Sequence, residues 1–510
     1  MSFIKGPLPI SFNNIYLNGR YTTPHSQDTL SLRNPKDGTL VANKIPIADG
    51  VDVDEAVRHA EAAFHGPWAT FSSSQRSDCF RRLADLLETR LLDILHLDSL
   101  TTGNPVSLIP TRERNYIKNC LLYYAGWTDK YKGDYFPADD GFVKLVRHEP
   151  IGVCAAINPY NSPVASLFIK AAPCLAVGNV LIVKPSEKGP LGSLAVAPLF
   201  EEAGFPPGVL QVLPGDGRTG ALLAEHMRVR KSANRAQDQF HWFGGYREED
   251  TNRSGAEQSQ KSHLGVGTVN GILARSGQVC VAASRVYVQR SISEKYISQY
   301  LAQMKAAALE MGDPQDPETK YGPLADTAAF ERVREMISRG KEEAELVIGG
   351  PRMDNKGCFI EPTVFLNPKP EAEIYRNEVF GPVVVVKTFD TEDEVVAAAN
   401  DTEYGLMAGV FTRDLKRALR VSGRIESGVV GINCVSMMSI QAPFGGKKES
   451  GIGREFGEYA SIHRICSLTG SANNLAMQAL RAFTEPKTIL IKYMTSSEIA
   501  NPSTMANGLT

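Results

Sequence analysis

The 510-residue sequence lacks the features that mark several specialised classes of protein. Its net charge is only −2, from 55 Lys and Arg against 57 Asp and Glu. A chain without a basic surplus is not expected to bind nucleic acid or anionic membrane surfaces. No apolar run approaches the ~20 residues that span a bilayer. The first residues, "MSFIKGPLPISFNN", also lack the charged start and apolar stretch of a signal peptide.

Cysteine is sparse and follows no metal-binding pattern. The eight cysteines form no CxxC pair, at positions 79, 120, 154, 174, 280, 358, 434 and 466. This scatter predicts free thiols, no metal site and a reducing compartment, so we expect a cytoplasmic protein. The 43% hydrophobic and 22% charged content are those of an ordinary globular chain.

The middle of the chain alternates short apolar runs with helical patterns. The runs "IGVCAAINP", "NVLIVKPSE" and "GVLQVLPG" are separated by the helical stretches "SLFIKAAPCLAVG" and "LGSLAVAPLFEEAG". This β-α-β-α-β order predicts a parallel sheet with right-handed crossovers. Cofactors bind such sheets at the carboxyl ends of the strands, which here carry "NPYNSP", "KPSE" and "PGDG". A later block, from "SRVYVQ" through "VVVVKTFD" to "SGVVGINC", predicts a second α/β unit.

One cysteine lies in an unusual setting, the stretch "ILARSGQVCVAASR" (Ile272–Arg285). A lone cysteine is most often a buried, inert residue. Six segments in order favour another interpretation of Cys280: "NPYNSP", "KPSE", "GFPPGVLQVLPGDG", "SGQVCVAASR", "NEVFGPV" and "APFGGKKESGIGRE". Together they resemble the NAD(P)-dependent aldehyde dehydrogenase superfamily, over about residues 10–231, 270–458 and 479–494.

The resemblance implies an α/β fold of the aldehyde dehydrogenase type. It would contain a Rossmann-like cofactor domain, a catalytic α/β domain and a small oligomerisation element, with a homodimer or homotetramer as the assembly. The cofactor domain is expected at 1–129 and 146–250, and the catalytic domain at 270–458. The oligomerisation element is expected at 130–145 and 485–494. The late strand "PKTILIKYM" would otherwise leave an exposed edge, which fits pairing with another subunit.

The same resemblance assigns the catalytic roles. Cys280 would attack an aldehyde to give a thiohemiacetal and then a thioester, which water hydrolyses to the carboxylic acid. Asn161 would donate its side-chain amide to the oxyanion, together with the backbone N–H of Cys280. A plain turn residue is the alternative for Asn161. Tyr160 stands where the family often has Trp.

The resemblance also implies that five residues hold the cofactor. Lys184 and Glu187 would bind the adenosine ribose, and the carboxylate of Glu187 favours NAD over NADP because it repels a 2′-phosphate. Gly217 would let the adenine approach the backbone, unless it only serves a turn with positive φ. Glu378 and Phe380 would hold the nicotinamide ribose and flank the ring. Lys184 as a solvated charge and Phe380 as core packing are the alternatives.

Two motifs of the family are missing between "PGDG" and Cys280. They are an "FTGS" turn for the pyrophosphate and an "ELGG" whose Glu is the general base. Read one nucleotide late, the codons of residues 238–247 can give "ISFTGSAATG", and those of 262–267 can give "VTLELG". We therefore hypothesise that about 238–267 is a frame-shifted translation, and that Ser461–Gln478 is an in-frame insertion.

The chain as written should then suffer in predictable ways. Without the two motifs it would lose a phosphate site and a base worth 10²–10⁴-fold, and so be weak or inactive. We also expect a gap in the sheet, where the strand after the base is deleted, and poor packing over 232–269. The alternative functions are a catalytically impaired relative that binds a ligand or partner, and an acyl-transfer or coenzyme-A-acylating enzyme.

The substrate is the least determined feature. By resemblance the aldehyde channel is lined near Leu167, Tyr287 and the 434–440 loop. The loop sequence "CVSMMSI" is apolar and rich in Met, which favours a medium-sized apolar or aromatic aldehyde as strongly as it favours simple core packing.

Overall fold

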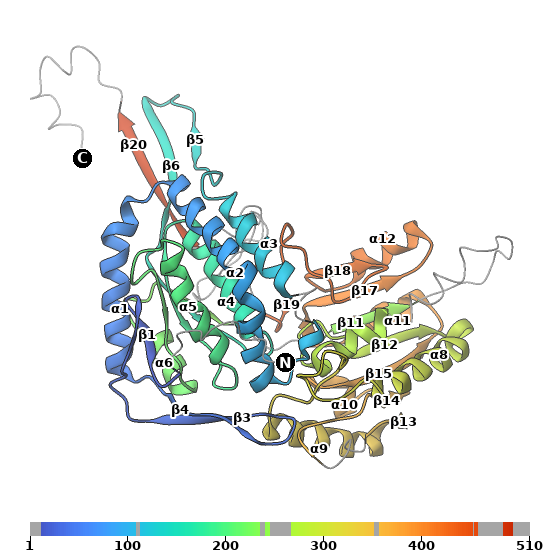
Figure 1. Ribbon diagram of the computed structural model, residues 1–510. Coiled ribbons are helices and arrows are strands. Elements are labelled where there is room, and N and C mark those ends of the chain that lie inside the picture. Colours follow the sequence, from blue (N-terminus) through green and yellow to red (C-terminus); the bar gives the residue numbers. More distant parts are fainter. Residues whose placement is uncertain are drawn as a thin grey trace, which may run out of the picture.

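The computed structural model describes residues 12–108, 113–234, 240–244, 267–350, 356–451, 453–456 and 483–492. Figure 1 shows two α/β units side by side and an arm of antiparallel strands that projects from the first unit. Within the described segments, no helix is both long and apolar enough to cross a membrane.

The first unit is built on a six-stranded sheet of order β10-β7-β8-β9-β1-β2. Its strands are β1 (Ile15–Leu17), β2 (Arg20–Thr22), β7 (Val153–Ile157), β8 (Val180–Lys184), β9 (Leu210–Val212) and β10 (Lys231–Asn234). Its helices are α1 (Gly50–His65), α2 (Ser73–Thr102), α3 (Arg114–Ala125), α4 (Pro163–Ala176), α5 (Leu191–Glu202) and α6 (Gly217–Glu225). Because β7, β8 and β9 are parallel neighbours with α4 and α5 between them, the predicted β-α-β-α-β order is confirmed.

The second unit has a seven-stranded sheet of order β13-β14-β15-β12-β11-β17-β18. Its strands are β11 (Phe240–Gly244), β12 (Arg285–Gln289), β13 (Glu345–Ile348), β14 (Thr363–Leu366), β15 (Val383–Phe389), β17 (Met407–Phe411) and β18 (Val429–Ile432). Its helices are α8 (Arg290–Ala308), α9 (Thr327–Glu343), α10 (Glu373–Arg376), α11 (Glu392–Asn400) and α12 (Leu415–Arg424). Separate hydrophobic cores cover the two faces, and Cys280 belongs to the core that contains α8.

The expected gap in this second sheet is wrong. Strand β11 lies in the middle of the sheet and pairs in parallel with both β12 and β17. The sequence also assigns 240–244 to the cofactor domain, whereas the structure places it in the second unit. A sheet ladder is made of backbone N–H and C=O groups, which every non-proline residue carries, so an unrelated extended segment can fill the position. The rest of the atypical stretch, 235–239 and 245–266, and the proposed insertion 461–478 lie outside the described residues.

Two smaller sheets extend from the first unit. The arm has the order β20-β6-β5, with β5 (Asp134–Phe136), β6 (Phe142–Pro150) and β20 (Thr484–Lys492). A hairpin of β3 (Thr29–Arg33) and β4 (Leu40–Pro46) runs along the bottom of Figure 1 toward the second unit. There the Cys358 N–H donates to the Pro35 carbonyl at 2.8 Å. A two-stranded ladder of β16 (Tyr404–Gly405) and β19 (Lys447–Lys448) completes the sheets of the described residues.

Candidate active site

Cys280 lies at the N-terminal edge of the second sheet. It follows the 3₁₀ helix η4 (Ala274–Gly277) and precedes β12, and its side chain is 4% exposed. Two hydrogen bonds fix this loop: the Ala283 N–H donates to the Gly271 carbonyl, and the Ser436 hydroxyl donates to the Val281 carbonyl at 2.6 Å. The thiol is therefore held in a defined place rather than on a free loop.

The turn before Cys280 has an unusual backbone. Arg275, Ser276 and Gly277 have φ values of 51°, 54° and 77°, in the left-handed region. A Cβ on Gly277 would lie 1.9 Å from the carbonyl oxygen of Gly381, so only glycine fits. The close approach packs the Cys280 loop against the residue that follows Phe380.

Asn161 reaches the same place from the first unit. It lies between β7 and α4, at the carboxyl end of a parallel strand, and is 7% exposed. Its Nδ2 donates to the carbonyl of Gln278, two residues before Cys280, at 2.8 Å. A primary amide has two N–H groups, and this bond uses one of them. The structure thus brings the predicted oxyanion donor to the predicted nucleophile's loop.

Glu378 and Phe380 lie in the loop between α10 and β15. The Arg332 guanidinium of α9 holds this loop by donating to the carbonyls of Val379 at 2.7 Å and Glu378 at 3.4 Å. The Phe380 ring meets the Tyr160 ring edge to face, with centroids 6.0 Å apart. Because Tyr160 belongs to the first unit, Phe380 is an interdomain contact beside Asn161 and not simple core packing.

Lys184, Glu187 and Gly217 gather at the carboxyl ends of β8 and β9. The Lys184 ammonium is buried and lies 3.3 Å from the Glu187 carboxylate, whose side chain is 44% exposed. Lys184 is therefore not the solvated charge of the alternative interpretation. Gly217 begins α6 without a positive φ, and a Cβ added there meets no atom within 4 Å. The positive-φ alternative for Gly217 is wrong, and open space beside its backbone fits an approaching adenine.

Lys188 connects the two groups of residues. Its ammonium lies 4.5 Å above the Tyr160 ring and 2.7 Å from the Asp326 carboxylate at the start of α9. Burial raises the pKa of Tyr160 well above its ordinary value, and the Asp326 carboxylate adds to the effect. A series of contacts thus runs from Lys188, the neighbour of Glu187, through Tyr160 to Phe380.

A partly buried ion pair beside the site was not predicted from the sequence. Lys170 of α4 pairs with Glu455, and their side chains are 10% and 23% exposed. The flanking residues Ile169 and Phe456 belong to the hydrophobic core that contains Cys280. The available signal was a single charge inside the otherwise apolar helix "SLFIKAAPCLAVG".

Two expected channel residues lie elsewhere. Tyr287 is 1% exposed and belongs to the core on the opposite face of the second sheet, where its hydroxyl lies 2.8 Å from that of Tyr375. Its assignment to the aldehyde channel is wrong, because successive residues of a strand point to opposite faces. Leu167 is fully buried in the core of the first unit. In the 434–440 loop, Met437 is exposed and Met438 packs against the core that contains Cys280.

Other cysteines lack the setting of Cys280. Burial raises the pKa of the Cys120 thiol to about 12 and that of Cys174 well above its ordinary value. Such thiols are unreactive because the thiolate is the nucleophile. Among the described residues no cluster of three His, Cys, Asp or Glu side chains could hold a metal ion.

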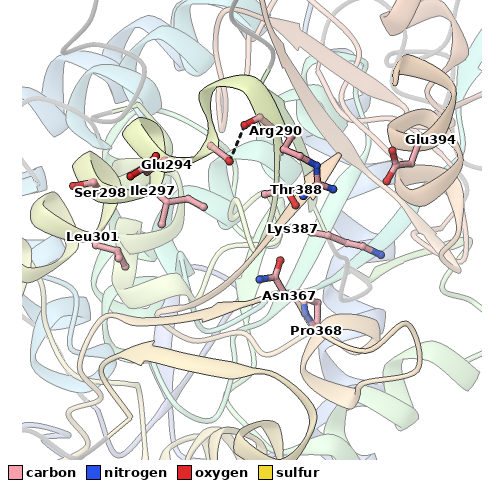
Figure 2. A pocket seen from close by; sticks show the side chains of 11 residues that line it. Arg290, Glu294, Ile297, Ser298, Leu301, Asn367, Pro368, Lys387, Thr388 and Glu394 are labelled. Carbon is pink, nitrogen blue, oxygen red and sulfur yellow. Dashed lines mark hydrogen bonds between the residues drawn. The ribbon is translucent and has the colours of Figure 1, made fainter. Parts of the chain in front are cut away.

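Of two hollows on the described surface, one lies away from the predicted site residues and the other borders Glu187. One, of about 850 Å³ (Figure 2), lies at the carboxyl ends of β12 and β15, whereas Cys280 precedes β12. It contains none of the predicted site residues. Its lining is Arg290, Ser293, Glu294, Ile297, Ser298, Leu301, Asn367, Pro368, Lys387, Thr388 and Glu394. The other, of about 590 Å³, lies between the units and includes Glu187 and Lys188.

The comparisons with known proteins agree with this geometry. A sequence model of the aldehyde dehydrogenase family matches residues 21–233 and 262–468. The mitochondrial aldehyde dehydrogenase of Equus caballus is 37% identical over 504 residues, which cover 95% of this chain and 96% of that protein. Retinaldehyde dehydrogenase 3 of Homo sapiens is 36% identical over 508 residues, covering 95% and 94%.

Solved structures give the same result for the fold. The NAD⁺ complex of an aldehyde dehydrogenase from Bacillus cereus superposes with a TM-score of 0.83 at 31% identity, covering 94% of this chain and 96% of that one. A gamma-glutamyl-gamma-aminobutyraldehyde dehydrogenase from Burkholderia cenocepacia has a TM-score of 0.84 at 33% identity, with the same coverage. The family match covers most of both units and every predicted site residue, and the chain therefore belongs to the aldehyde dehydrogenase family.

Proposed function

We propose that this chain oxidises an aldehyde to a carboxylic acid with NAD, using Cys280 as the nucleophile. The observation that carries the proposal is the bond from the Asn161 amide to the Cys280 loop, which joins oxyanion donor and nucleophile across two units. Its relatives are named as aldehyde dehydrogenases, and the comparisons favour neither the impaired-protein nor the acyl-transfer alternative.

The residues around Cys280 suit acyl chemistry on sulfur. The thiolate adds to the aldehyde carbon, and the carbonyl oxygen takes the negative charge. The second N–H of Asn161 and the backbone N–H of Cys280 are the donors for that oxygen, each worth roughly 3 kcal/mol in the transition state. After oxidation the thioester on Cys280 is hydrolysed, because a thiolate is a good leaving group.

The described residues fit NAD. Open space at Gly217 admits the adenine, and Lys184 with Glu187 presents an ammonium and a carboxylate to the ribose. Phe380 and Glu378 would hold the nicotinamide end. NAD, when bound, supplies the hydride acceptor. The Glu187 carboxylate disfavours NADP because a 2′-phosphate beside it would be repelled.

The position where the family carries its general base falls at Gly265, outside the described residues. If the stretch is frame-shifted, a transcript across the codons of 226–280 and 459–479 should restore "FTGS", "ELGG" and an uninterrupted C-terminal segment. A transcript that encodes the residues as written would reject the hypothesis and favour an impaired enzyme. Sequencing that transcript therefore precedes the choice of the chain to assay.

The direct test is NADH formation by the full chain with a series of apolar and aromatic aldehydes. Cys280→Ala should lose at least roughly 10⁴-fold in kcat, as other nucleophile deletions do, while keeping NAD binding. Activity that survives in Cys280→Ala would contradict the assigned nucleophile. Aldehyde preference in the same series tests the apolar substrate class, which the Met437 and Met438 side chains support.

We also propose that the arm joins subunits into a homodimer or homotetramer. Four large apolar side chains are exposed on it, namely Tyr135, Phe136, Leu490 and Ile491. Exposed apolar strands at a sheet edge are normally covered by another chain. Changing Leu490 and Ile491 to Lys should lower the mass measured by light scattering, whereas Leu415→Lys on α12 should not. An unchanged mass in the double variant would reject the arm as the interface.

A cytoplasmic location remains our proposal. It is supported by the free state of the seven described cysteines, which suits a reducing compartment. Subcellular fractionation with an antibody to the full chain tests it.

A further inference from the structure

Arg275 occupies an unusual position in the Cys280 loop. Its guanidinium donates to the main-chain carbonyl of Asn161 and forms an ion pair with Glu113, at the start of α3. The side chains of Arg275 and Glu113 are only 13% and 14% exposed. The Asn104 amide donates to the same Asn161 carbonyl at 3.3 Å. A partly buried charge thus donates to one backbone oxygen of a predicted catalytic residue.

These contacts hold Asn161 to the Cys280 loop at two points. The Asn161 side chain donates to Gln278, and its carbonyl accepts from Arg275, and both partners belong to the loop. A guanidinium suits this task because its planar fork can bind two acceptors in fixed directions. With its backbone and its side chain both held, the Asn161 amide has little freedom to turn.

The backbone of Arg275 supports a role for its side chain. Its φ and ψ are 51° and 37°, a left-handed conformation that non-glycine residues keep only where surrounding contacts hold them. Glycine would fit this backbone at lower cost. An arginine here therefore indicates that the contacts of the guanidinium outweigh the strain of the left-handed backbone.

We propose that Arg275, with Glu113 as its counter-ion, is a positioning residue that holds the Asn161 amide at the oxyanion position beside Cys280. The inference rests on the proposed function, since it takes Cys280 as nucleophile and Asn161 as oxyanion donor. It goes further by assigning the alignment of those two groups to an ion pair that reaches α3.

The test uses p-nitrophenyl acetate and the full chain without NAD. The Cys280 thiolate bonds to the acetyl carbon, the oxyanion collapses, and p-nitrophenolate leaves with the bonding electron pair. Stopped-flow absorbance gives the acylation rate, and peptide mass spectrometry locates the acetyl group on Cys280. Asn161→Ala should slow acylation roughly 100-fold. Arg275→Met should slow acylation roughly tenfold, because this substitution displaces the Asn161 amide without removing it.

The decisive comparison is the double variant. If Arg275 acts through the Asn161 amide, Asn161→Ala with Arg275→Met should be no slower than Asn161→Ala alone. If the double variant is slowed by the product of the two single-variant factors, the proposal is overturned. Should Arg275→Met fail to fold, Arg275→Lys keeps the charge but loses the two-pronged contact, and the same comparison applies.

A matched control separates positioning from stability. Arg76 is also a half-buried arginine whose guanidinium donates to two backbone carbonyls, those of Ala176 and Phe71. Arg76→Met should lower Tm comparably and leave the acylation rate unchanged. An equal slowing in Arg76→Met would overturn the proposal. Acylation that needs Cys280 and Arg275 in a chain that forms no NADH would support the inference while rejecting the proposed dehydrogenase function.

Discussion

At the scale of single residues, the site depends on a few positions where the backbone conformation or the surrounding space restricts which residue can fit. The turn from Arg275 to Gly277 runs through the left-handed region and ends three residues before Cys280, the proposed nucleophile. Such conformations are costly for most residues and persist only where neighbours enforce them. Here the neighbour is the loop that carries Phe380, so strain in the turn before Cys280 is coupled to that loop.

Gly277→Ala is expected to disrupt both loops. Its new methyl group would overlap the Gly381 carbonyl and occupy a positive φ, so we expect a loss of roughly 3 kcal/mol of unfolding free energy and most activity. Urea unfolding measures the loss of stability, and NADH formation measures the loss of activity. Gly423→Ala in α12 is the control, because open space surrounds it and it should be neutral or slightly stabilising.

Glu187→Ser should change the coenzyme preference. Removing the carboxylate takes away a charged acceptor for the ribose and the repulsion of a 2′-phosphate. NAD should bind roughly tenfold more weakly, corresponding to the loss of a charged hydrogen bond, and NADP more tightly. Calorimetric titration with each coenzyme gives both constants. Glu202→Ser, in an exposed pair with Arg90, should alter neither; an unchanged NADP affinity in Glu187→Ser would remove Glu187 from the site.

At the scale of elements, the edge strand β10 carries the clearest pH-dependent group. Lys231 is buried against the Phe483 ring, with its ammonium 3.6 Å from the ring centroid. Burial lowers the pKa of Lys231 to about 7, from an ordinary value of 10.5. Between these two values the unfolded chain binds a proton that the folded chain does not. Stability should therefore rise as pH rises from about 7 to about 10.

Lys231→Met should remove this rise. One titrating group changes the unfolding free energy by at most about 1.4 kcal/mol per pH unit. We expect Lys231→Met to lose this dependence on pH, which the wild type shows, and to be more stable than the wild type near neutral pH. A series of urea unfolding curves from about pH 7 to about pH 10 measures it. Lys118→Met, which removes an exposed lysine, should keep the wild-type slope. Parallel curves for wild type and Lys231→Met would show that Lys231 stays charged in the folded chain.

At the scale of the whole molecule, the candidate active site lies where the two units meet. Asn161, Tyr160 and Lys188 come from the first unit, and their partners come from the second. The hairpin β3–β4 adds another bridge between the units. Anything that loosens this junction should affect catalysis before it affects either unit's core.

Lys188→Met is the mildest way to loosen the junction. The pair with Asp326 is partly exposed, so we expect a loss of at most about 1 kcal/mol in stability. The apparent Kd for NAD should rise up to roughly fivefold, the equivalent of that energy, because Tyr160 loses the cation above its ring. Scanning calorimetry and NAD titration measure the two effects. Lys118→Met serves again as the control, and equal NAD affinities in both variants would contradict a role for Lys188.

The sequence alone determined the family, the parallel β-α-β-α-β core and the candidate residues, because these depend on local patterns of apolar residues and on short motifs. It could not show that β11 fills the middle of the second sheet. Backbone pairing is insensitive to side-chain identity, and the segment resembles no family motif. It also misplaced Tyr287, whose direction depends on the register of β12.

Only the tertiary structure decided which residues meet. Asn161 and Gln278 are 117 positions apart, and Arg275 and Glu113 are 162 apart. No local pattern encodes such distances, because they follow from how two sheets pack against each other across the junction. The motifs thus indicated which chemistry to expect, and packing determined that Cys280, Asn161 and Arg275 lie at one place.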